Sequence, residues 1–76
     1  MKKFTEDNPI TAIDIFNDIK RRLRDPAKQV VTTNDAQVEF NNCCFEFIAD
    51  EWCSPGAIDK AIELINNYYD VKISDQ

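Results

Sequence analysis

Three cysteines carry the most distinctive chemistry in this chain: Cys43 and Cys44 are adjacent, and Cys53 follows them. A structural zinc site takes its four ligands mainly from Cys and His, commonly in CxxC-type spacing. The chain has no His and no CxxC pair. We therefore expect no metal, no cofactor and three free thiols, which indicates a reducing compartment and a cytoplasmic location.

The familiar forms of nucleophilic catalysis lack their partners here. A Ser or Cys nucleophile is usually activated by His, which this sequence does not contain. Its single glycine, Gly56, cannot form a glycine-rich phosphate loop. The sequence predicts that the protein is not an enzyme and has no catalytic residues.

Acidic side chains dominate the second part of the chain. Residues 1–28 hold seven Lys/Arg and five Asp/Glu, whereas residues 29–76 hold two Lys/Arg and nine Asp/Glu, for a net charge of −5. Such a surface is often only solubilising, but it can also steer a basic partner toward a binding site. We predict partner-binding residues here, with Cys44 as an exposed thiol on the same face: Glu39, Glu46, Asp50, Glu51, Trp52 and Cys44.

Two amphipathic helices are expected at the ends of the domain. Thr11 and Asp14 resemble a capping box at the start of the first, and Pro26 should end it. Its apolar stripe comprises Ala12, Ile13, Phe16, Ile19 and Leu23. The second helix should start at Ser54 as N-cap, followed by Pro55.

The middle of the chain alternates with a period of two, which is typical of strands. We expect strands over residues 29–33, 36–40 and 43–48, joined by two-residue turns at 34–35 and 41–42. This register collects one apolar inner face, namely Val31, Ala36, Val38, Phe40, Cys43, Phe45 and Phe47. Residues 71–74 also alternate and predict a short C-terminal strand.

The predicted fold class is α+β, a two-layer sandwich of order α-β-β-β-α. A three-stranded antiparallel meander would pack on two helices in a single α+β domain over residues 9–76, after a flexible N-terminal tail over residues 1–8. The core would bury Val31, Val38, Phe40, Phe45 and Phe47 against Phe16, Ile19, Ile62 and Ile65. Trp52 would either close one end of this core or anchor a partner, because Trp is enriched at binding hot spots.

These features predict a small, acidic, non-enzymatic protein-binding module whose partner is a larger protein with a basic surface. By analogy of fold and composition it could be a phage-type inhibitor that blocks a basic site on a nucleic-acid-handling host protein. The alternatives are a homodimeric structural or regulatory subunit, or an antitoxin or immunity protein. A weak contact of the basic residues 20–24 with nucleic acid has less in its favour, because the chain is acidic overall. No secretion signal and no membrane contact are expected, since polar residues follow Lys2 and Lys3.

Overall fold

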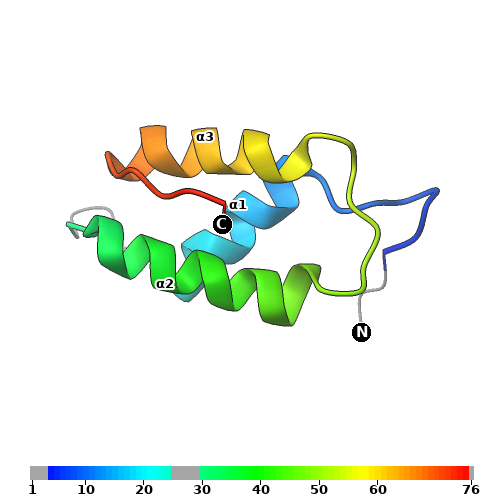
Figure 1. The fold of residues 1–76 in the computed structure, drawn as a ribbon, viewed down its shortest axis with the longest axis horizontal. Helices are drawn as coiled ribbons and strands as arrows, with labels where there is room; N and C mark the ends of the chain where they lie inside the picture. The colour runs from blue at the N-terminus through cyan, green and yellow to red at the C-terminus, as the bar shows by residue number, and fades with distance from the viewer. Residues whose placement is uncertain (1–3, 25–29, 76) are drawn as a thin grey trace.

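Helices make up most of the part of the chain that the structure describes. This computed structural model describes residues 4–24 and 30–75. Residues 1–3 of the expected tail, Pro26 and the first residue of the expected first strand lie outside that part. The elements are α1 (Ala12–Arg22), α2 (Thr33–Cys43), the π-helical turn η1 (Cys44–Ile48) and α3 (Ala57–Tyr69) (Figure 1).

Helix α1 begins as its sequence predicts. The Thr11 hydroxyl accepts a hydrogen bond from the Asp14 backbone N–H at 3.3 Å, and the Asp14 carboxylate accepts one from the Thr11 N–H at 3.0 Å. These reciprocal bonds satisfy backbone donors that the first helical turn leaves without partners. The helix buries Ile15, Asp18 and Ile19, whereas Ile13 is exposed. The buried face of α1 therefore includes Ile15, which the predicted stripe omitted, and leaves out Ile13, which the predicted stripe contained.

The predicted three-stranded meander is wrong, and with it the α+β sandwich. Residues 33–48 form α2 and η1, and the described residues contain no strand, only an isolated parallel bridge between Ile10 and Cys53. The segment interpreted as a turn at residues 34–35 is the first turn of α2. There the Thr32 hydroxyl accepts a bond from the Asp35 N–H at 3.0 Å. Thr at the N-cap and Asp in the first turn both favour a helix start.

The buried face of α2 explains why the helix forms. Ala36, Phe40 and Cys43 are buried and stand at helical spacing, four and three residues apart. Val38, which the sheet register placed in the core, is 46% exposed. The same segment therefore contains both the alternating pattern that predicted strands and an apolar stripe at helical spacing. Burial of that stripe stabilises the helix and outweighs the weak helix propensity of Thr, Asn and Val.

The π turn η1 determines which of its side chains are buried and which are exposed to solvent. The Ala49 N–H donates to the Cys44 carbonyl oxygen at 2.9 Å, a bond that spans five residues in place of the usual four. Phe45 is 83% exposed, whereas Ile48 is buried. Phe47 is half-buried and meets Phe4 edge to face, with ring centroids 5.5 Å apart. The predicted burial of Phe45 is wrong.

Helix α3 starts at Ala57, after Gly56, and not after Ser54 as predicted. Gly56 occupies the N-cap with φ +74°, a left-handed conformation that glycine adopts without strain. The Ala57 N–H donates to the Ser54 carbonyl at 3.0 Å. Helix α1 packs against both α2 and α3. The largest fully buried side chains of the core are Phe40, Ile10, Ile15, Ile19, Ile65 and Cys43.

The C-terminal segment, residues 71–75, is an extended strap and not a strand. It runs back from the end of α3 over the space between α3 and α2 (Figure 1). The Gln37 side chain of α2 accepts from the Ser74 N–H at 3.0 Å and donates to the Ser74 carbonyl at 2.9 Å. The Asn66 side chain of α3 pairs with Ile73 in the same way, at 2.9 and 3.3 Å. Two amide side chains therefore fix the strap, whose own Val71 and Ile73 are buried.

This correction removes the ground for the phage-type inhibitor analogy, which rested on an α+β sheet. The described residues give that analogy and the α+β class no support.

Substitutions at Phe40 and Phe45 distinguish the helical fold from the sandwich. Phe40 is 1% exposed and Phe45 is 83% exposed. Phe40→Ala should lower the free energy of unfolding by about 3–5 kcal/mol, because it leaves a cavity in the core. Phe45→Ala should change that free energy by less than about 0.5 kcal/mol, as surface substitutions do. Urea unfolding followed by circular dichroism measures both, and comparable losses for the two variants would contradict the fold.

Candidate functional site

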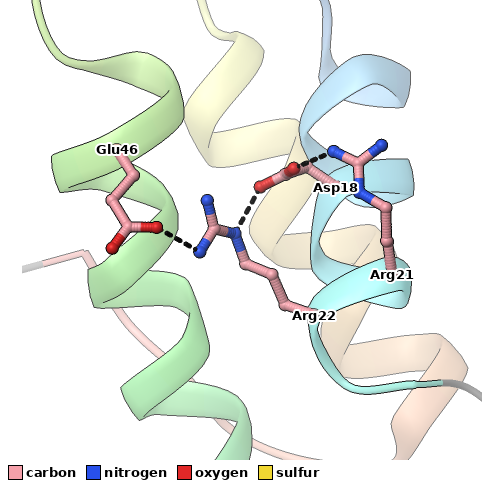
Figure 2. Close-up of polar contacts among 4 residues, drawn as sticks. All are labelled: Asp18, Arg21, Arg22 and Glu46. Carbon is pink, nitrogen blue, oxygen red and sulfur yellow. Dashed lines mark hydrogen bonds and ion pairs between the residues drawn. The ribbon is translucent and has the colours of Figure 1, made fainter.

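A chain of ion pairs joins α1 to η1. Asp18 of α1 is 4% exposed, and both Arg21 and Arg22 of the same helix donate to its carboxylate (Figure 2). The Arg22 Nε lies 2.6 Å from Asp18 Oδ2. The other side of the same guanidinium reaches across to η1, where Arg22 Nη1 lies 2.8 Å from Glu46 Oε1 (Figure 2). One arginine thus links a buried carboxylate to the π turn.

Hydrogen bonds keep Asp18 ionised in spite of its burial. Burial by itself would raise the pKa of this carboxyl, but hydrogen bonds from Arg22, Cys43 and Arg21 outweigh it and lower the pKa below its ordinary value. The pKa of Arg22 is raised, and the largest cause of this increase is its hydrogen bond to Asp18. Asp18 and Arg22 therefore form a structural ion pair in which both groups are charged at neutral pH.

The thiols are protonated at neutral pH. Burial raises the pKa of Cys43, and its hydrogen bond with Asp18 raises it further. Burial is also the largest cause of the raised pKa of Cys44 and of Cys53. A reactive cysteine has a lowered pKa instead. Across residues 4–24 and 30–75, no three His, Cys, Asp or Glu side chains gather as a set of metal ligands.

The four predicted acidic residues lie in different surroundings. Glu46 pairs with Arg22, and the Glu51 carboxylate accepts a bond from the Phe4 N–H at 2.9 Å. Glu39 lines a hollow of about 250 Å³ together with Arg22 and other residues between α1 and α2. Asp50 is exposed, at a left-handed position with φ +64°. Two of the four carboxylates are therefore engaged within the chain.

Trp52 lies in the connection between η1 and α3, and its side chain is 55% exposed. Its carbonyl oxygen accepts a bond from the Ile10 N–H at 2.7 Å, and the Ser54 N–H donates to the Ile10 carbonyl at 2.8 Å. These two bonds hold the connection against the segment that precedes α1. The tryptophan ring thus remains largely accessible at the surface.

A hollow among the described residues lies beside η1. It measures about 460 Å³ and is lined by Phe40, Asn41, Cys44, Phe45, Ala49 and Asp75. Cys44 was predicted as a binding residue, and the structure places it in this lining. The others were missed, although Phe40, Asn41, Cys44 and Phe45 have the spacing of one helical face. Nothing in the local sequence places Asp75, because the strap brings it there from the end of the chain.

The basic end of α1 is partly occupied by contacts within the chain. The Lys20 ammonium lies over two aromatic rings, 5.4 Å from the centroid of Phe16 and 5.1 Å from that of Tyr68. Arg21 and Arg22 both pair with Asp18. These cations are less available to phosphates than the sequence alone suggests.

Comparisons with protein-family models, with curated proteins and with solved structures find no match for this chain. None of the helices in the described ranges has the length and apolar character that crossing a membrane requires. Its function must therefore be argued from its own surface.

Replacing Asp18 should change how stability depends on pH. Because the folded state lowers the pKa of Asp18 below its ordinary 3.8, the contribution of this carboxylate is present above that pH and is lost as the pH falls through the folded value. Asp18→Asn should therefore cost about 1–3 kcal/mol at neutral pH, and the difference from wild type should shrink in acid. Urea unfolding at a series of pH values measures this difference.

Glu63→Gln is the matched control, since Glu63 is 69% exposed and lies 3.9 Å from Lys60. It should alter stability by less than about 0.5 kcal/mol at any pH. An Asp18→Asn variant with wild-type stability at neutral pH would show that the network contributes nothing.

The thiols should react slowly in the native protein. Cys44→Ser and Cys53→Ser together leave Cys43 as the remaining thiol. We expect this variant to react with a chromogenic disulfide reagent at neutral pH only after unfolding, because Cys43 is fully buried. Cys44→Ser retains Cys53, and Cys53→Ser retains Cys44. In each of these single variants, the retained thiol should react more slowly in the native protein than in the same protein unfolded in urea. A native thiol that reacts faster than the unfolded chain would contradict the raised pKa values.

Proposed function

We propose that this chain is a non-enzymatic protein-binding module that docks the face around η1 onto a basic surface of a larger protein. We place this binding in the cytoplasm, which is where three free thiols are expected to persist.

The exposure of the Phe45 side chain is the observation that supports this proposal most strongly. This side chain is 83% exposed, in a π turn, at the edge of the hollow beside η1. π-helical turns are often found at functional sites, since they disturb the regular hydrogen-bond pattern of a helix. Aromatic side chains are enriched in protein interfaces, where a few such anchors provide most of the binding free energy.

The charge around Phe45 supports a basic partner. Residues 30–59 contain six Asp/Glu and no Lys or Arg. A surface of one sign accelerates the approach of a partner of opposite sign and disfavours partners of like sign. Phe45 would then supply the apolar contact, and the surrounding carboxylates would supply steering.

Support for binding over catalysis comes from the titratable groups. Asp18 is the one buried charged side chain in the described ranges, and two arginines neutralise it. The three thiols have raised pKa values. An acid–base or nucleophilic step requires a group whose pKa is tuned in the opposite way.

A photocrosslinking experiment tests this function. The photoreactive amino acid benzoylphenylalanine replaces Phe45 in one variant and Tyr68 in a second, since Tyr68 is exposed on α3 and lies outside the hollow. We expect illumination in the native cells to crosslink one defined protein through position 45, and that protein should be basic at the contact. The yield in lysate should fall as the ionic strength rises, because salt screens charge pairs at a surface.

The control position should give no such product. Equal crosslinking from positions 45 and 68, or none from position 45 in a variant that retains its helical circular dichroism, would overturn the proposed function.

A further inference from the structure

The hollow beside η1 has an apolar interior and an exposed aromatic edge. Phe40, with 1% of its surface exposed, lies deepest among the lining residues, and Phe45 stands at the edge with 83% exposed. Cys44 and Ala49 complete the apolar lining. A volume of about 460 Å³ lies within the range of sites that take small ligands or a few side chains of a partner.

The strap supplies the carboxylate at this hollow. Gln37 and Asn66 fix Ser74 and Ile73 by four hydrogen bonds, and the next residue, Asp75, lines the hollow. Its charge is close enough to raise the pKa of Cys44, although burial is the larger cause. Asp75 is therefore held at the hollow by the fold and is not merely near it along the sequence.

No cation of the described lining offsets this carboxylate. The six lining residues include no Lys or Arg. Of the two carboxylates that adjoin lining residues along the chain, Glu46 is paired with Arg22, whereas Asp50 is exposed. The nearest basic residue in the strap is Lys72. Its backbone bonds to Thr33 at the far end of α2, about 16 Å from Cys44 along the helix at the α-helical rise.

Charge therefore selects among the occupants of this hollow. In a symmetric dimer, a second copy of the chain would bring its own acidic face against this one, and like charges across an interface are unfavourable. A partner segment that carries Lys or Arg beside a large apolar side chain matches both features, because the apolar side chain can enter the hollow while the cation meets Asp75.

We infer that the hollow formed by η1 and the strap is a docking site for a protein segment that inserts one large apolar side chain, flanked by Lys or Arg, between Phe45 and Asp75. This inference rests on the function proposed above and names the chemistry of the partner.

Selection from a library of random linear peptides, displayed and captured on the full chain, tests the inference. We expect the enriched peptides to share a large apolar residue with Lys or Arg within one or two positions of it. Phe45→Ala should weaken the affinity of an enriched synthetic peptide by more than about tenfold, the loss typical of an aromatic anchor. Asp75→Asn should weaken it by about two- to fivefold at low salt, as expected for an exposed charge pair.

Two matched variants serve as controls. Val30→Ala removes an apolar side chain that is 87% exposed and lies outside the hollow, and Asp59→Asn removes an exposed charge from α3. Both should leave peptide affinity unchanged. Enriched peptides that lack cations, or peptides that bind Phe45→Ala as well as wild type, would overturn the inference.

Sedimentation of the chain alone tests whether a second copy of the chain, and not a different protein, occupies the hollow. A dimer that dissociates on Phe45→Ala would show that a second copy fills the hollow, which would overturn the inference. A crosslinked partner through position 45 together with enriched peptides that lack Lys and Arg would refute the inference while the proposed function stands. Failure of both the crosslink and the selection would refute the proposed function and this inference together.

Discussion

The Asp18 carboxylate is the constraint on which the arrangement of the helices depends. A buried charge is tolerated only where other groups pair and hydrogen-bond with it. Arg21 and Arg22 supply that pairing from α1 itself, and Cys43 contributes a hydrogen bond from the last turn of α2. Because Arg22 also reaches Glu46, the same cluster fixes η1 relative to α1 (Figure 2).

The position of η1 then determines what the surface offers. With Cys43 buried against α1 and Glu46 held by Arg22, the intervening turn presents Phe45 outward while Phe40 and Ile48 stay in the core. The strap completes the surface from the other side, since Gln37 and Asn66 fix Ile73 and Ser74 and so bring Asp75 to the hollow. An ion network on one side and amide side chains on the other thus build an apolar hollow with an acidic edge.

Part of this fold could be predicted from sequence. The Thr11–Asp14 capping box and the amphipathic pattern of α3 are local signals, and both correspond to helices in the structure. The middle segment carried two patterns at once. Val38 and Phe40 supported a period of two, while Ala36, Phe40 and Cys43 supported the helical period that the core selects. Thr32 and Asp35 already signalled a helix start, and the interpretation as a turn overlooked that signal.

The site was harder to predict than the helices. Cys44, one of the predicted binding residues, lines the hollow beside η1, and Asp50 follows the lining residue Ala49 in the chain. Glu46 and Glu51 were selected for their charge, but contacts with Arg22 and the Phe4 N–H engage them. Those contacts and the strap join residues far apart in sequence, such as Gln37 and Ser74, and no periodicity within one segment reports them.

Phe45 points into solvent in the isolated chain, and we propose that a protein partner covers it. Fluorine NMR on the chain labelled with fluorophenylalanine tests it directly, because each of the five phenylalanines gives its own signal. With a soluble paramagnetic agent, the Phe45 signal should relax fastest and the Phe40 signal slowest. Addition of the protein that crosslinks through position 45 should protect Phe45 selectively. If the Phe45 signal of the isolated chain relaxed as slowly as that of Phe40, the exposure of Phe45 would be contradicted. If its relaxation were unchanged in the complex, binding through Phe45 would be contradicted.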